Sequence, residues 1–155
     1  MSTIFDSANF IVRIPEKPHV DRADGGHIII DPKIPWEDRT QLSLPLGIEL
    51  DRLTTMMGEA MREALNQRGV DVARINYQEN GNWRQELHVH LYGRARSAKW
   101  QPYGHALHFP HPSEQPEFYE GLHPLTAEDI DAIREEIKRL IVTDKYRNFL
   151  MPTNM

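Results

Sequence analysis

The most regular alternation of apolar and polar positions lies in residues 84–92, called here the histidine strand. Leu87, Val89 and Leu91 are separated by single residues, which is the period of two expected for a β-strand with one buried face. The opposite face of such a strand carries four side chains: Glu86, His88, His90 and Tyr92. The pattern therefore predicts a strand that presents a carboxylate and two imidazoles to the same side of a sheet.

Three further segments have the apolar and β-branched composition of strands: residues 10–12, 27–31 and 70–77. Asn80, Gly81 and Asn82 stand between the last of these segments and the histidine strand. Because Asn-Gly between two alternating segments is typical of a tight β-turn, we expect these two strands to form a hairpin.

Two segments have apolar residues at the spacing of a helix. The first spans about Leu46 to Gln67 and ends before Gly69, a residue type that commonly terminates helices. The second follows Thr126, whose side chain can cap it, and its apolar stripe continues to Ile141. Both helices are therefore predicted to be amphipathic, with one face against a core.

The remaining segments are less regular. Residues 93–104 are typical of an ordered loop and residues 113–123 of an irregular segment, while the tail from residue 144 is expected either to dock on a partner or to fray. The order strand-strand-helix-strand-strand-helix predicts an α+β fold, an antiparallel sheet with a long helix packed on it and an extra C-terminal helix. We expect residues 1–110 to form the domain and residues 111–155 to be an extension, with one helix, that packs on the same domain.

Composition and charge limit the location and the partners of the protein. The chain of 155 residues is long enough to bury roughly 70% of its unfolded surface in one domain, and the absence of Cys excludes thiol catalysis. No segment approaches the ~18 apolar residues of a membrane span and no secretory signal is present, so we expect a cytoplasmic protein. The net charge of −5 argues against nucleic acid or a membrane as a partner. A small phosphorylated ligand fits the basic residues around the histidine strand: Arg84, Arg94, Arg96 and Lys99.

The residues alone allow three interpretations of the paired histidines. They are hydrogen-bonded to neighbouring groups in a half-buried position, or they include a nucleophile with its supporting base, or they bind a metal. In the last case Glu86 and either His105 or His108 would complete a set of nitrogen and oxygen ligands for zinc, iron or nickel. Three other histidines lie beside prolines in loops and are expected to face solvent: His19, His111 and His123.

Several motifs, in this order, resemble the histidine triad superfamily of nucleotide hydrolases and transferases. Residues 26–33, Gly-His-Ile-Ile-Ile-Asp-Pro-Lys, follow the family's Gly-His, aliphatic strand and Pro-Lys ending. A long helix and a strand with Asn76 come next, and Gly81-Asn82 stands where the family has Gly-Gln. Residues 87–94, Leu-His-Val-His-Leu-Tyr-Gly-Arg, then resemble the family's active strand with its following Arg. The resemblance covers roughly residues 10–103 and does not include the C-terminal helix.

The active strand of the family has three histidines separated by single apolar residues, and the middle one attacks phosphorus. The flanking motifs make His88 the attacking residue and His90 the third histidine, with Glu86 in place of the first. A second register, in which His90 attacks and Tyr92 takes the third position, stays open.

The resemblance implies hydrolysis or nucleotidyl transfer at an α-phosphate through a nucleotidyl-histidine intermediate, with no cofactor or metal. A neutral imidazole suits this reaction, because its pKa of about 6.5 leaves it mostly unprotonated at neutral pH. His90 would hydrogen-bond to the phosphate or help the leaving group, and Glu86 or His27 would orient the attacking ring. Four further residues would bind the nucleotide: Asn76, Asn82, Trp83 and Arg94. The family often dimerises through the long helix and an edge strand, so a homodimer is also implied.

Two departures from the family pattern keep other functions open. A carboxylate at Glu86 would raise the pKa of neighbouring histidines and repel phosphate. Trp83 stands where the family usually has a small residue, and it would either stack on a base or block the pocket. The alternatives are a metal-dependent enzyme built on the His-x-His pair and a non-catalytic protein that binds a nucleotide or another protein.

Overall fold

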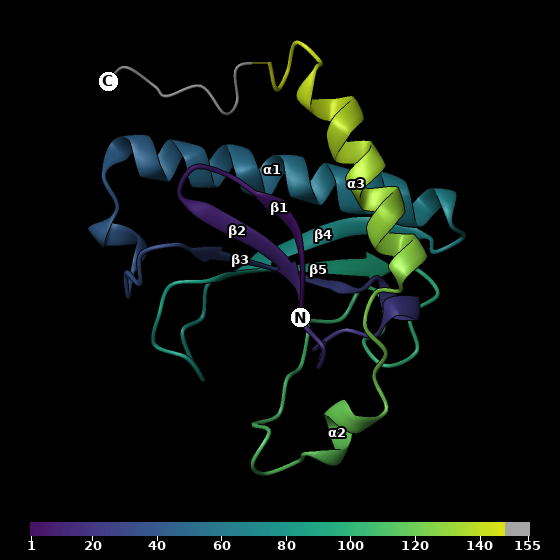
Figure 1. Ribbon diagram of the computed structural model, residues 1–155. Coiled ribbons are helices and arrows are strands. Elements are labelled where there is room, and N and C mark those ends of the chain that lie inside the picture. The colour runs from purple at the N-terminus through teal and green to yellow at the C-terminus, as the bar shows by residue number, and fades with distance from the viewer. Residues whose placement is uncertain (148–155) are drawn as a thin grey trace.

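The computed structural model of the chain describes residues 1–147, and its five strands form one antiparallel sheet (Figure 1). In chain order the strands are β1 (Ser2–Asp6), β2 (Phe10–Ile14), β3 (His27–Pro32), β4 (Val72–Gln78) and β5 (Val89–Ala95). Their order across the sheet is β1-β2-β3-β5-β4, and every neighbouring pair is antiparallel. Two strands that carry histidines, β3 and β5, are therefore adjacent, and β4 is an edge strand.

The helices lie on both sides of this sheet. They are α1 (Leu44–Gln67), α2 (Glu117–Glu120) and α3 (Ala127–Ile141), with two short 3-10 turns, η1 (Arg22–Asp24) and η2 (Arg39–Gln41). The long helix α1 packs on β4 and β5, α3 crosses α1, and α2 lies on the opposite side of the sheet (Figure 1). The predicted α+β fold is confirmed. None of the helices within residues 1–147 has the length and apolar character of a transmembrane span.

The core lies between α1 and the sheet. The helix starts at Leu44, slightly before the predicted Leu46, because Pro45 is compatible with the first turn of a helix. Its apolar stripe is buried against the inward-facing side chains of β3 and β5. The largest of these helix side chains are Leu50, Leu53, Met56, Met57, Met61 and Leu65. Each buried side chain of this size contributes about 1.5–3 kcal/mol, so this interface is the main source of stability.

A buried carboxylate holds α3 in place. The side chains of Thr126 and Asp129 cap the helix reciprocally, each accepting a hydrogen bond from the other residue's backbone N–H. Asp129 also accepts hydrogen bonds of 2.6–2.9 Å from the guanidinium groups of Arg22 and Arg68. Because Arg22 belongs to η1 and Arg68 follows α1, one side chain joins α3 to the loop before β3 and to the end of the long helix.

The chain beyond α3 docks on α1 as far as the structure describes it. The hydroxyl of Tyr146 donates to the carboxylate of Glu59 over 2.6 Å, and Lys145 pairs with the same carboxylate. These contacts lie within the chain, so docking of the tail on a partner stays a prediction, and residues 148–155 lie outside the described residues.

Four local features of the structure differ from the predictions. The edge strand β1 was not predicted, because it is short, its register is interrupted and Ile4 is its one buried residue. The histidine strand is shorter than residues 84–92, since β3 pairs with β5 only from Val89 to Tyr92. Residues 79–88 form a long connection from β4 in place of the expected tight turn, and α2 forms in a segment expected to be irregular.

Candidate active site

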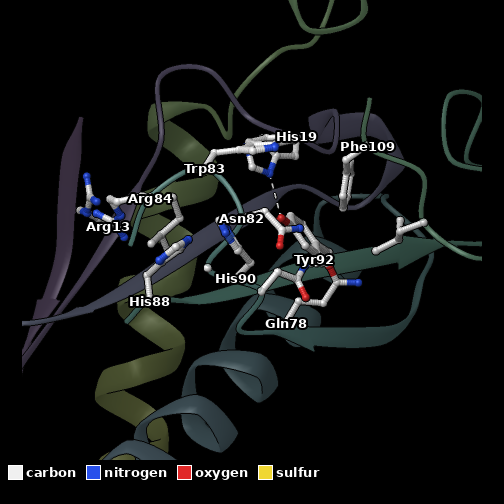
Figure 2. A pocket seen from close by; sticks show the side chains of 14 residues that line it. Arg13, His19, Gln78, Asn82, Trp83, Arg84, His88, His90, Tyr92 and Phe109 are labelled. Atoms are coloured by element: carbon white, nitrogen blue, oxygen red, sulfur yellow. Dashed lines mark hydrogen bonds between the residues drawn. The ribbon is translucent and has the colours of Figure 1, made fainter. Parts of the chain in front are cut away.

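A cavity of about 490 Å³ lies on the face of the sheet opposite α1 (Figure 2). Along β5, Val89 and Leu91 are buried in the core, so the alternating side chains of His90 and Tyr92 face the cavity. The connection between β4 and β5 supplies one wall, and Leu107 and Phe109, which follow β5, supply another. The cavity is thus built on rigid strands and closed by loops.

The first functional group is the ring of His88, which borders the cavity just before β5. Nδ1 of His88 lies 2.6 Å from the backbone oxygen of Glu86. A carbonyl oxygen only accepts hydrogen bonds, so Nδ1 carries the proton and Nε2 of the neutral ring holds a lone pair. Burial is the main reason that the pKa of His88 lies below its ordinary value. Nε2 of His88 therefore has the protonation state of a nucleophile.

A chain of hydrogen bonds fixes the opposite tautomer for His90. The backbone N–H of His19 donates to Nδ1 of His27 over 3.1 Å, so the proton of this ring is on Nε2. Nε2 of His27 then donates to Nδ1 of His90 over 2.9 Å. Burial lowers the pKa of His27 well below its ordinary value and that of His90 to about 3, so both rings are neutral. Nε2 of His90 consequently carries a proton and can donate a hydrogen bond.

His19 is a cavity residue that sequence reasoning missed. Its side chain was expected to face solvent, but Nδ1 of His19 lies 2.8 Å from the hydroxyl of Tyr92 (Figure 2). Burial is the main cause that lowers the pKa of His19 to about 4. The loop turns inward at η1, where the backbones of Gly25 and Gly93 are so close that neither position has room for a Cβ. Gly25 and Gly93 are the sequence feature that could have predicted this inward position of the loop, because their close approach brings the loop against β5.

Two arginines border the cavity and share one carboxylate. Arg13 of β2 and Arg84 of the β4–β5 connection both line the cavity, and each donates to a different oxygen of Asp31. Asp31 lies on β3 and is itself outside the lining. None of the residues that line the cavity is an Asp or a Glu. The cavity is therefore electropositive in a chain of net charge −5.

Aromatic rings form another part of the wall. The ring of Trp83 lies edge-on to the ring of His19, with 5.0 Å between the centroids, and 6.0 Å from the ring of Tyr119 in α2. Phe109 packs 4.9 Å from Tyr92, and the hydroxyl of Tyr119 donates to the backbone oxygen of Pro110 over 2.6 Å. The segment after β5 thus contributes to the site.

Comparisons with known proteins identify the fold. No family model and no curated protein matches the sequence. Among solved structures, a histidine triad protein from Marinobacter aquaeolei has a TM-score of 0.62 at 16% identity, covering 90% of this chain and 87% of its own. A hypothetical histidine triad nucleotide-binding protein from Sulfolobus tokodaii has a TM-score of 0.60 at 17% identity, with coverage of 90% and 85%. The chain has the fold of histidine triad proteins.

A larger protein shares the same fold in part. A uridylyltransferase has a TM-score of 0.52 at 15% identity, and the match covers 88% of this chain but 41% of that protein. The histidine triad fold agrees with the resemblance found in the sequence motifs. The alignment of Glu86 with the family's first histidine is not tested by these matches, and it stays a prediction.

In this histidine triad fold, some of the predicted site residues meet at the cavity and others do not. Four of them line it: His88, His90, Asn82 and Trp83. His27 lies behind His90 and reaches the cavity only through their hydrogen bond. Asn76, Arg94 and the side chain of Glu86 lie outside the lining.

Arg94 and Asn76 form a buried support for the wall of the cavity. Nη1 of Arg94 donates to the side-chain oxygen of Asn76 over 2.7 Å, and Nη2 donates to the backbone oxygen of His105 over 2.6 Å. The loop after β5 therefore covers the guanidinium, and Arg94 is buried. Both residues lie outside the cavity lining, and their predicted contact with nucleotide stays a prediction.

Glu86 contributes its backbone and not its carboxylate. The expectation that its side chain shares a face with His88 and His90 is wrong, because the chain leaves the sheet before Val89 and the side chain of Glu86 is exposed. Its carbonyl oxygen nevertheless orients the ring of His88. The carboxylate is therefore not placed to repel a phosphate in the cavity.

One group of described side chains brings three potential metal ligands together. His19, His27 and His90 each offer a ring nitrogen, and these atoms lie within 4.8 Å of one another. This set differs from the predicted one, which depended on the carboxylate of Glu86. A histidine binds a metal through an unprotonated nitrogen, but His27 already accepts a hydrogen bond at Nδ1 and carries its proton at Nε2. These three rings do not fit a metal ion unless His27 loses that proton.

Proposed function

We propose that the protein is a nucleotide hydrolase or nucleotidyl transferase in which Nε2 of His88 attacks the α-phosphorus. The observation that carries the proposal is the pair of opposite tautomers two residues apart. Nε2 of His88 holds a lone pair because Nδ1 donates to the backbone of Glu86, whereas Nε2 of His90 holds a proton because its Nδ1 accepts from His27. A nucleophile and a hydrogen-bond donor thus border one electropositive cavity.

The reaction follows from these two nitrogens. As the bond between Nε2 of His88 and phosphorus forms, the bond to the leaving group breaks and its electron pair departs with the leaving group. The ring of His88 becomes positively charged, and the backbone oxygen of Glu86 accepts its more acidic N–H. His90 donates to a phosphate oxygen on which negative charge increases. Water, or another acceptor in a transferase, then takes the nucleotidyl group and restores the neutral ring.

Two further observations support this function. The exposed carboxylate of Glu86 leaves the cavity without a negative group that would repel phosphate. Proteins of the same fold include one named as nucleotide-binding and one named as a uridylyltransferase. The role of Trp83 is then to stack on the base or another planar group, because its ring borders the cavity without filling it.

The intermediate provides the test. The protein is incubated with adenosine phosphoramidate or a dinucleoside polyphosphate, quenched in base and analysed by peptide mass spectrometry. We expect one adenylyl group on His88, and neither adduct nor turnover in His88→Asn. His108→Asn, an exposed histidine outside the cavity, is the matched control and should behave as the unmodified protein. Wild-type turnover in His88→Asn, an adduct on His90, or nucleotide binding without turnover would each contradict the proposal.

We propose a homodimer as the assembly. The edge strand β4 and the adjacent α1 are the elements through which the resemblance implies dimerisation, and Tyr77 of β4 is 49% exposed. Light scattering coupled to gel filtration should give twice the chain mass of 18.1 kDa. A mass of one chain across micromolar concentrations would contradict the dimer.

A further inference from the structure

The cavity has two chemically different ends, with His88 and His90 between them (Figure 2). Arg13 and Arg84 lie at one end, and the ring of Phe109 lies at the other (Figure 2). The reaction proposed above gives a role to the two histidines and none to these guanidinium groups. The function proposed above therefore does not account for the two arginines.

The arginine end carries more positive charge than its ion pairs need. Nε of Arg13 and Nη2 of Arg84 donate to the two oxygens of Asp31, so two positive charges share one negative charge. A purely structural ion pair would need only one of these guanidinium groups. In the described part of the chain, their remaining N–H groups make no hydrogen bond to protein, and both side chains border the cavity. Asp31 thus fixes the position of two guanidinium groups without neutralising both.

We infer that Arg13 and Arg84 form a second anion-binding site, which holds the leaving group of a nucleotide whose α-phosphate is joined to a further phosphate. This inference rests on the proposed function. A nucleoside is uncharged, so a second negative charge next to the α-phosphate belongs to the leaving group. When the P–O bond breaks, its electron pair goes to the leaving phosphate, and two fixed guanidinium groups stabilise the charge that develops there.

The protonation states of the titratable side chains in the cavity agree with a phosphate as the leaving group. An amine that leaves a phosphoramidate must gain a proton, whereas a phosphate departs as an anion without one. Burial lowers the pKa of His90 to about 3 and that of His19 to about 4, and it raises the pKa of Tyr92. These groups are neutral at pH 7 and weak acids. The site therefore offers two fixed cations that suit an anionic leaving group, whereas an amine would have to take its proton from a weak acid such as the neutral ring of His90.

Anion binding can be tested without any turnover. Inorganic tripolyphosphate is titrated into the full chain by calorimetry, and Arg13→Gln and Arg84→Gln should each weaken its binding about tenfold or more, since each removes charge-assisted hydrogen bonds. Arg96→Gln is the matched control, because Arg96 pairs with Asp71 and is outside the cavity lining. Thermal unfolding confirms that each variant is folded, and the more exposed Arg84 is the safer of the two. Equal affinity in all four proteins would overturn the inference.

Kinetics distinguish the leaving group from the nucleotidyl reaction itself. A dinucleoside polyphosphate and adenosine phosphoramidate deliver the same adenylyl group but differ in the leaving group. We expect Arg84→Gln to lower kcat/KM for the polyphosphate about tenfold or more while changing kcat/KM for the phosphoramidate little. Equal losses for both substrates would overturn the inference and leave the proposed function standing. Tripolyphosphate binding that depends on the arginines, with no turnover of either substrate, would contradict the function but support the anion site.

Discussion

The loop that leads into β3 contributes to two groups of buried polar side chains, and these groups satisfy their hydrogen bonds in opposite ways. In the first group, Asp24 accepts hydrogen bonds of 2.7–2.8 Å from three consecutive backbone N–H groups, those of residues 99–101. Asp129 accepts from two guanidinium groups and a backbone N–H. In the second group, the backbone N–H of His19 donates to the neutral ring of His27, which in turn donates to the neutral ring of His90.

This difference distinguishes the buried carboxylates, which stabilise the fold, from the imidazoles, which contribute to the cavity. The carboxylates meet several donors each, which makes them strong local anchors but leaves them no role in the cavity. The hydrogen bond from the backbone of His19 to Nδ1 places the proton of His27 on Nε2. His27 donates this proton to Nδ1 of His90, so the proton of His90 is on Nε2, and His90 lines the cavity. Charged groups therefore hold the loop and α3 in place, while neutral groups provide the donor beside His88.

The largest expected effect falls on His88, next to the donor that the neutral group provides. His88→Asn should lower kcat on the order of 10⁴-fold or more, because it removes the proposed nucleophile. Its thermal unfolding temperature should stay close to that of the wild type, since the ring makes one hydrogen bond, to a backbone oxygen. Single-turnover kinetics and a thermal melt measure both quantities. A large drop in the unfolding temperature of this variant would show that the ring of His88 stabilises the fold, as the buried carboxylates do.

The next effect falls on the carboxylates. Asp129→Asn should lower the free energy of unfolding by about 3 kcal/mol, because two guanidinium groups lose a buried counter-charge. Asp131→Asn, an exposed residue of the same helix paired with Arg134, should change it by less than about 0.5 kcal/mol. Urea denaturation gives both values. Similar losses in the two variants would contradict the anchoring role of Asp129.

A third test removes the link between the two ends of the imidazole chain. His27→Leu should lower kcat roughly 10- to 100-fold with little change in KM, because Nδ1 of His90 loses its donor and the ring loses its preferred tautomer. His27→Gln, which can both accept and donate, should recover part of the loss. We call His27 a positioning residue, and a loss confined to KM or an absence of rescue by Gln would argue against that role.

The same two groups should also differ in how their contribution to stability depends on pH. The pKa values of His90 and His19, about 3 and about 4, lie below the ordinary value of about 6.5, so the unfolded chain binds protons that the native chain does not. Stability is then complete above about pH 6.5 and falls as the pH drops toward 4, on the order of 1 kcal/mol per pH unit for each histidine. Urea denaturation gives the free energy of unfolding at pH 5 and pH 7. The difference between these two values should be smaller for His90→Gln than for the wild type, and equal differences would contradict the assigned role of His90.

Acid should also weaken the carboxylate group, but in a lower range of pH. Burial alone would raise the pKa of Asp129, whereas the hydrogen bonds from Arg22, Thr126 and Arg68 lower it well below its usual range. Asp129 therefore contributes stability above about pH 4 that is lost as the pH falls toward its native-state pKa. The histidines act between about pH 4 and 6.5, so the two groups are separable in one denaturation series.

Periodicity predicted the elements that are packed on one face. The stripe of α1 and the alternation of Val89 and Leu91 point to the core because burial selects apolar residues at the period of each element. The short edge strand β1 lacks such a pattern, and Ile4 is its one buried residue. The fold class therefore followed from the sequence, although the strand count did not.

Side-chain alternation located site residues correctly only in the regular part of β5, whereas His88, Asn82 and Trp83, which also line the cavity, lie before that strand and were predicted from the flanking motifs. His90 faces the cavity as alternation requires, but Glu86 lies before the first paired residue and follows no strand period. His19 and Arg84 come from loops, whose positions depend on long-range contacts such as the one with Asp31. Arg94 was predicted to bind nucleotide, but the loop that follows β5 covers its guanidinium through the backbone oxygen of His105. No local pattern in a sequence encodes such coverage.

The central claim is that His88 and His90 hold opposite tautomers. Long-range proton–nitrogen correlation spectra of the ¹⁵N-labelled protein at pH 7 report which ring nitrogen of each histidine carries the proton. We predict a proton on Nδ1 and a bare Nε2 for His88, and a bare Nδ1 with a proton on Nε2 for His90. The same tautomer in both rings, or a positively charged His90 at this pH, would contradict the account.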